Sequence, residues 1–158
     1  MKDILKNAPI LQLSDKVDFL FDTCFLVWVF KHKQEKKLSQ FLEKHTCAIT
    51  SFTLEEFTHI HIPTKILQDA KKFFKTHTIP ILEVAPHIGE WENEKQFVTE
   101  IMPELAKEEH DLSDAVLLAA AIRTNASVLT RDKHDIFNAH IEKFLDFSKT
   151  KIYNTFID

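Results

Sequence analysis

Residues 17–30 read VDFLFDTCFLVWVF, and this stretch joins two hydrophobic patterns at a single acidic residue. The apolar run at 17–21 is typical of a buried β-strand that ends at Asp22. From residue 25 to about 44, apolar residues recur at helical spacing, which predicts an amphipathic helix. A strand that passes directly into a helix is the repeating unit of α/β proteins.

The same alternation of strand and helix patterns continues along the chain. Further strands are predicted at 46–51, 79–84 and 127–130, with one more around 143–147. Thr53 and Glu56 have the spacing of a capping box, and the helix that Thr53 would open is interrupted near Pro63. Other helices are predicted at 64–77, at 87–109 with a break at Pro103, and at 112–122, where the run AVLLAAAI has no polar stripe.

This element order predicts the fold class. Strands separated by helices imply right-handed crossovers and a parallel sheet with helices on both faces. We therefore expect a three-layer α/β/α fold with a central parallel sheet of four to five strands. The length suggests one domain over 1–158, with an N-terminal extension at 1–16 and a C-terminal segment at 136–158 whose structure the pattern does not define.

The composition excludes several kinds of site. Gly89, in an expected turn at 86–90, is the one glycine, so neither a Walker-type loop nor a glycine-rich dinucleotide turn can be built. Any phosphate chemistry must then use side chains or a metal ion. Cys24 and Cys47 have no metal-site spacing and make no disulfide framework. With no signal sequence or membrane-spanning run, the chain is expected to be soluble and cytoplasmic.

The charge is distributed unevenly. The formal net charge is −4, and residues 83–114 hold ten acidic side chains against two lysines. This acidity argues against a protein that binds nucleic acid through charge alone, but not against an enzyme whose acids hold cations. The acidic segment is interpreted either as a solvated helical face or as a rim that shapes substrate access.

Four acidic residues are placed near the ends of the predicted strands. Asp22 follows the first strand, Glu56 lies in the first turn after the second, and Asp132 follows the fourth. Asp114 lies in the first turn of the apolar helix that leads into the fourth strand. Because ligands of parallel sheets bind outside the carboxyl ends of the strands, the four carboxylates are expected to share one pocket.

Such a pocket would suit Mg²⁺ or Mn²⁺. Gathered carboxylates repel one another unless a cation intervenes, and hard divalent cations prefer oxygen ligands. A bound ion can activate water and stabilise the oxygens of a phosphodiester under attack. Helix capping is the simpler explanation of the pair Asp111 and Asp114 taken alone, and likewise of Thr53 and Glu56. The coincidence of four acids at one edge favours the metal site.

The motifs FDTCFLVWVF, TSFTLEEF, DLSDAVLLAAA and VLTRD occur in this order between about residues 17 and 135. Together they resemble a PIN domain, most closely the compact PIN ribonucleases typified by the VapC toxins of toxin–antitoxin pairs. The resemblance implies that the metal-binding acids are Asp22, Glu56, Asp114 and Asp132. It also implies that Thr23 and Thr130 support these acids, and that Asp111 is either an extra acid or a cap.

The resemblance further implies an activity and partners. The activity is cleavage of single-stranded RNA by an endoribonuclease that depends on Mg²⁺ or Mn²⁺, and the partners are an antitoxin protein and a second copy of the chain in a homodimer. Arg131 and Lys133 flank Asp132 and are predicted to contact substrate phosphates. Cys24 stands where members of the family often carry a small polar residue.

Other functions fit the sequence less well. A catalytically silent PIN module that binds RNA or protein is the alternative, and the presence of all four acids counts against it. Haloacid-dehalogenase-like enzymes need a second acid where Cys24 stands, and receiver domains need an aspartate after the third strand, where Glu83 is the acid available. His59 and His61 diverge on a helix, which disfavours zinc binding. The predicted strands disagree with the all-helical HD phosphohydrolases.

Overall fold

The computed structural model describes residues 2–108, 111–132, 141 and 145–158. Within these residues, six parallel strands form one sheet in the order β1-β4-β3-β2-β5-β6. The strands are β1 (Ile10–Leu11), β2 (Phe19–Phe21), β3 (Cys47–Thr50), β4 (Ile81–Leu82), β5 (Ser127–Leu129) and β6 (Ile152–Tyr153). The predicted α/β class with a central parallel sheet is confirmed, but the expected four to five strands were too few.

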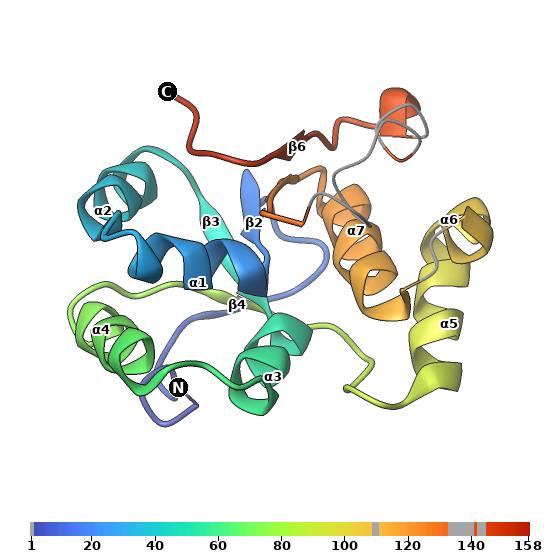
Figure 1. Cartoon of the computed structure of the whole chain (residues 1–158). Helices are drawn as coiled ribbons and strands as arrows, with labels where there is room; N and C mark the ends of the chain where they lie inside the picture. Colours follow the sequence, from blue (N-terminus) through green and yellow to red (C-terminus); the bar gives the residue numbers. More distant parts are fainter. Residues whose placement is uncertain (1, 109–110, 133–140, 142–144) are drawn as a thin grey trace.

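Seven α-helices occur in the same residues. They are α1 (Thr23–Lys31), α2 (Glu35–Lys44), α3 (Ser51–His59), α4 (Thr64–Phe74), α5 (Trp91–Ile101), α6 (Pro103–Glu108) and α7 (Leu112–Thr124), with a 3₁₀ helix, η1 (Leu145–Phe147), before β6. Figure 1 shows α1, α2 and α4 on one side of the strands and α5, α6 and α7 on the other. None of these helices combines the length and the apolarity needed to cross a membrane.

The central strand β2 explains why both faces of the sheet are covered. Its side chains alternate between two cores, because successive residues of a strand point to opposite faces. Phe19 and Phe21 pack with α1, α2 and α4, whereas Leu20 packs with α7 and α5. All three side chains are buried. A continuous apolar strand therefore requires a helical layer on each face, as the predicted three-layer arrangement has it.

The pairing of β2 with β5 sets the position of the candidate site. Phe21 lies opposite Leu129 in this parallel pair. The next residues of the two strands, Asp22 and Thr130, are therefore neighbours at the carboxyl edge of the sheet. The Asp22 N–H donates to the Leu129 carbonyl at 2.9 Å, which holds this edge in register.

The single helix predicted from residue 25 to about 44 is wrong. The helix α1 ends at Lys31, and α2 begins at Glu35. Between them, Lys33 has a φ of 54°, in the left-handed region that interrupts a right-handed helix. The apolar spacing misleads here because both helices bury one face against the same core.

The capping box predicted at Thr53 and Glu56 is also wrong. Thr50 is the N-cap of α3, and its hydroxyl accepts a hydrogen bond from the Thr53 N–H at 2.9 Å. The helix thus begins three residues earlier than the pattern suggests. Glu56 is six residues after this N-cap, too far along the helix to complete a capping box with it. Its carboxylate contacts Thr23 of α1 instead.

Both edges of the sheet come from segments that the sequence left undefined. The strand β1 lies within the predicted extension 1–16 and pairs with β4, and β6 lies in the C-terminal segment and pairs with β5. The strand predicted around 143–147 is wrong in its described part, where η1 lies, and residues 143 and 144 are outside the described residues. A strand of two residues has too little alternation to be detected from its pattern.

Candidate active site

Asp22 lies between β2 and α1 at the carboxyl edge of the sheet, and it is the N-cap of that helix. Its Oδ1 accepts a hydrogen bond from the Thr23 N–H at 2.7 Å. Its Oδ2 accepts hydrogen bonds from the Thr130 hydroxyl at 2.7 Å and from the Cys24 thiol at 2.8 Å. Asp22 is 7% exposed, so the protein holds this carboxylate buried and in a defined orientation.

The ionised form of Asp22 is electrostatically unfavourable in this position. Burial raises the pKa of the carboxyl above its usual value, the charge of Asp132 raises it further, and the three hydrogen bonds only partly oppose this rise. Among the described residues, no Lys, Arg or His forms an ion pair with Asp22. A buried carboxylate without a counter-ion is costly, and a bound cation would remove that cost.

Glu56 of α3 is linked to Asp22 through Thr23. The Thr23 hydroxyl donates to Glu56 Oε2 at 3.0 Å, while the Thr23 N–H donates to Asp22. Burial raises the pKa of Glu56 to about 7, and the charge of Asp22 is the next largest cause. The charges of Asp111 and Glu94 raise the pKa of Glu56 by smaller amounts. Without a cation, this carboxyl therefore titrates near neutral pH.

Thr130 links Asp22 to Asp132. The Thr130 hydroxyl donates to Asp22 and accepts a hydrogen bond from the Asp132 N–H at 3.0 Å. Thr130 is fully buried and Asp132 is half-buried. Both threonines that were predicted to support the acids, Thr23 and Thr130, thus contact them directly.

The helix α7 contributes two further acids. Asp111 is its N-cap and accepts a hydrogen bond from the Ser113 N–H at 2.8 Å, so the capping interpretation of Asp111 is correct. The Asp111 charge also helps to raise the pKa of Glu56. Asp114 is half-buried in the first turn of α7, a helix that packs against α3 and β2.

Hydrogen bonds through two threonines connect three of the predicted acids. Asp22 interacts electrostatically with both Asp132 and Glu56, and it shares Thr130 with the first and Thr23 with the second. In the described part of the chain, no three acidic, histidine or cysteine side chains are close enough together to bind one ion. Lys133 lies outside the described residues.

Arg131 is held against the protein. Its guanidinium lies over the Trp28 ring, 4.7 Å from the ring centroid, and donates to the Asn154 carbonyl at 2.8 Å. These contacts tie the segment after β5 to α1 and to the segment after β6. The predicted contact of Arg131 with substrate phosphate would need its other N–H groups, and it stays a prediction.

Two residues near these acids were not identified from the sequence. The Cys24 thiol donates to Asp22, and its sulfur accepts a hydrogen bond from the Arg131 N–H at 3.2 Å. Glu94 of α5 is 2% exposed, although it belongs to the acidic segment interpreted as a solvated face or a rim. Glu94 shares helical spacing with the apolar Phe97 and Val98, which is the signal that could have identified it.

We expect the Cys24 thiol to be chemically inert in the native protein. Burial raises its pKa to about 12, and the charge of Asp22 adds to this effect, so very little thiolate forms near neutral pH. Mass spectrometry after iodoacetamide treatment should find Cys24 unmodified until the protein unfolds. Alkylation at the same rate in native and unfolded protein would contradict this. Cys24→Ser keeps a donor to Asp22 and should be more stable than Cys24→Ala by about 1 kcal/mol in the free energy of unfolding. Its melting temperature should therefore be the higher of the two.

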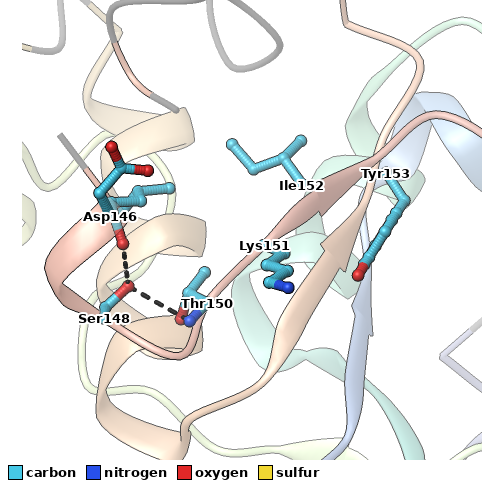
Figure 2. A pocket seen from close by; sticks show the side chains of 7 residues that line it. Asp146, Ser148, Thr150, Lys151, Ile152 and Tyr153 are labelled. Atoms are coloured by element: carbon cyan, nitrogen blue, oxygen red, sulfur yellow. Dashed lines mark hydrogen bonds between the residues drawn. The ribbon is translucent and has the colours of Figure 1, made fainter. Parts of the chain in front are cut away.

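A separate pocket lies between η1 and β6. The cavity has a volume of about 310 Å³. Figure 2 shows side chains that line it, among them Asp146, Thr150, Lys151 and Tyr153. The Ser148 hydroxyl donates to the Leu145 carbonyl at 2.9 Å and accepts from the Thr150 N–H at 3.2 Å. None of the strand-end acids lines this pocket, so it is not the candidate active site.

A family model of the PIN domain matches residues 19–140. The chain belongs to the PIN-domain family. The fold of this PIN domain is similar to that of a chain in the crystal structure of VapBC2 from Rickettsia felis bound to a DNA fragment from their promoter, with a TM-score of 0.57 and 18% sequence identity. The similarity covers 87% of this chain and 98% of that one. No curated protein matches the chain in sequence.

The residues at the sheet edge of this PIN domain fit a divalent cation. PIN domains are generally nucleases, and they generally use divalent metals. The donors available here are carboxylate oxygens, which suit Mg²⁺ and Mn²⁺ better than softer ions. Asp22 in particular is buried beside two other acids and has no basic ion-pair partner among the described residues.

Proposed function

We propose that this PIN domain is an endoribonuclease that cleaves RNA phosphodiester bonds with Mg²⁺ or Mn²⁺. The observation that carries the proposal is the environment of Asp22. Three hydrogen bonds orient its buried carboxylate, and Asp132 adds like charge. As the N-cap of α1, Asp22 stabilises that helix, but a serine or an asparagine could cap it without burying a charge, which destabilises the fold. The arrangement supports a cation-binding role.

The proposed roles follow from the contacts. Asp22 and Asp132 would be the central ligands, with Glu56 and Asp114 completing the acidic pocket. A bound divalent cation supplies activation of water and compensates the charge of the scissile phosphate. The chain's own task is to hold the ligands in place: Thr130 orients the carboxylate of Asp22 and the backbone of Asp132, and Thr23 joins Asp22 to Glu56.

Metal removal tests the proposed activity. Purified protein should cleave an unstructured single-stranded RNA in the presence of Mn²⁺, and excess EDTA should abolish the cleavage. Asp114→Asn should lose most of the activity, whereas Asp146→Asn, which exchanges an exposed aspartate, should keep it. Cleavage that continues in EDTA, or full activity in Asp114→Asn, would rule the mechanism out. RNA that is bound but left intact would identify the silent binding module instead.

We also infer that the protein is the toxin of a toxin–antitoxin pair, acting in the cytoplasm as a homodimer with an antitoxin partner. The similarity of its fold to a chain of VapBC2 supports this context. Expression of the chain alone should arrest bacterial growth, and co-expression of the neighbouring gene product should restore it. Normal growth during expression of an active nuclease would indicate a housekeeping enzyme.

A further inference from the structure

A groove of about 240 Å³ lies between α1, α2 and residues 155–158, in the segment that follows β6. Figure 1 shows this segment running from β6 toward α2. On α2, the residues that line the groove include Lys37, Gln40 and Lys44, all of them exposed. Their spacing of i, i+3 and i+7 puts them on one face of the helix. One wall of the groove is therefore a row of polar and basic side chains.

Aromatic side chains line the same groove. Trp28 of α1 is half-buried there, and Phe156 packs against Phe25 and Phe41 with ring centroids 5.1 and 5.3 Å apart. These ring contacts anchor the segment after β6 on α1 and α2. Lysines beside aromatic rings are typical of surfaces that bind single-stranded nucleic acid, because the lysines contact phosphates and the rings contact bases.

The groove carries more positive than negative charge. Lys37 and Lys44 line it together with one acidic side chain, that of Asp158. Neither lysine belongs to an ion pair in the described part of the chain, so both ammonium groups are available to a phosphate. The acids at the sheet edge have the opposite effect, because they repel the phosphates on either side of the scissile one. An RNA substrate therefore gains most from cations beside the acidic pocket.

Two contacts connect the groove to the candidate active site. The guanidinium of Arg131 lies 4.7 Å from the centroid of the Trp28 ring, and Asp132 is the next residue of the chain. Asp22 is the N-cap of α1, and Trp28 lies six residues further along the same helix, which corresponds to about 9 Å of its axis. At about 3.4 Å per stacked nucleotide, a strand of roughly three nucleotides spans this distance.

We propose that this groove binds the single-stranded RNA that flanks the scissile phosphodiester, with Lys37 and Lys44 on its phosphates and a base against Trp28. The inference rests on the proposed function and gives its substrate a second point of attachment. Phosphates and ring faces are common to all nucleotides, so the groove accepts any base sequence. In a duplex the bases are stacked and paired, so the groove favours single-stranded over double-stranded RNA.

The salt dependence of RNA binding tests the two lysines without cleavage. A fluorescent oligouridine of about twelve nucleotides, titrated with the full chain in EDTA, gives the dissociation constant by anisotropy. For Lys37→Gln/Lys44→Gln, the plot of log affinity against log salt concentration should be less steep by about 1.4, the value for two lost phosphate contacts. The affinity at about 0.1 M salt should fall roughly ten- to thirty-fold. The matched control is Lys36→Gln/Lys95→Gln, which removes two exposed lysines outside the groove and should bind as wild type.

Trp28 reports whether a base enters the groove. The chain has two tryptophans, so Trp91→Phe, at an exposed position, leaves Trp28 as the one source of tryptophan fluorescence. The oligouridine should quench this fluorescence. With Lys37→Gln/Lys44→Gln added, the same quenching should need a ten- to thirty-fold higher RNA concentration, as in the anisotropy titration.

RNA binding that leaves the Trp28 fluorescence unchanged would overturn the proposal, as would the wild-type salt dependence in Lys37→Gln/Lys44→Gln. Quenching by a poly-glutamate peptide but not by RNA would overturn it in favour of an acidic protein partner. Cleavage of RNA with Mn²⁺ together with wild-type binding by the lysine variant would keep the nuclease function and reject the groove. Lysine-dependent binding and quenching with RNA left intact in Mn²⁺ would support the groove and reject the nuclease function.

Discussion

Replacement of Asp22 by asparagine is expected to abolish RNA cleavage and, at the same time, to raise the melting temperature of the metal-free protein. The first effect follows from the loss of a central ligand. Removal of groups that merely support metal ligands costs roughly ten- to a hundred-fold in activity or affinity. Loss of Asp22 itself should exceed that range. The rate of cleavage of a single-stranded RNA at saturating Mn²⁺ measures it.

The second effect follows from the burial of Asp22. Its pKa is raised in the folded protein, so the ionised carboxylate opposes folding at neutral pH. Asparagine has the same shape without the charge, and the Thr130 hydroxyl and the Cys24 thiol can reorient toward the new amide. For a chain of this length, each kcal/mol of added stability shifts the melting temperature by roughly 2–4 °C. A thermal melt in EDTA measures the shift.

Asp146→Asn serves as the control for Asp22→Asn. Asp146 is exposed, so its replacement should change neither the cleavage rate nor the melting temperature. A folded Asp22→Asn that cleaves at the wild-type rate would exclude Asp22 as a ligand. A lower melting temperature without metal would show that the three hydrogen bonds outweigh the cost of burying its charge.

The second large effect is a pH dependence of stability that belongs to Glu56. Its pKa is about 7 in the folded protein, against 4.5 as the ordinary value expected in the unfolded chain. Between these values the folded protein binds more protons than the unfolded chain, so the contribution of Glu56 to stability falls as pH rises through this window. One pKa unit corresponds to about 1.4 kcal/mol, and after allowance for the partial exposure of Glu56 we expect a loss of about 1–3 kcal/mol.

Glu56→Gln isolates this contribution, because glutamine does not titrate. In EDTA, the free energy of unfolding of the variant relative to wild type should increase from pH 4.5 to pH 8 by the same amount, measured by urea denaturation at each pH. Mn²⁺ should restore wild-type stability at the higher pH, since a cation favours the ionised carboxylate. Glu43→Gln, on the exposed surface of α2, should follow the wild-type profile. Parallel profiles for wild type and Glu56→Gln would contradict the prediction.

The two predictions share one physical origin. The protein buries carboxylates where their charge opposes folding, and Asp22 and Glu56 both have raised pKa values for this reason first. Sites that are arranged for function commonly cost stability in this way. A cation that binds only the folded state would return that stability, in proportion to its concentration above the dissociation constant.

Several features of the fold were accessible from local pattern. The continuous apolar run of β2, the longer amphipathic segments and the unbroken apolar run of α7 predict strands and helices because each pattern reflects how many faces of an element are buried. From their order, the parallel α/β sheet follows, and with it the common edge at which Asp22 and Asp132 lie. The charge interaction between these two residues agrees with that inference.

Other features were not accessible from these local patterns. Lys33 lies between α1 and α2 and separates them, although the apolar spacing suggested one helix. Thr50 rather than Thr53 caps α3, although the capping pattern suggested Thr53. The edge strands β1 and β6 form because β4 and β5 offer them hydrogen bonds, and two residues alone have no detectable period. For the edge strands, the deciding partner lies outside the window from which a pattern can be recognised.

The acids illustrate the same division. Their positions relative to the predicted strands identify Asp22, Glu56, Asp114 and Asp132 as candidates, because residue type and element order are properties of the chain itself. Burial, hydrogen bonds and mutual charge exist only after the helices pack, and they distinguish Glu94, with its unpaired oxygen between α5 and α7, from the exposed Glu92 on the same turn. Composition could place both in one acidic segment, but desolvation depends on three-dimensional surroundings, so only the packed structure separates a buried charge from a solvated one.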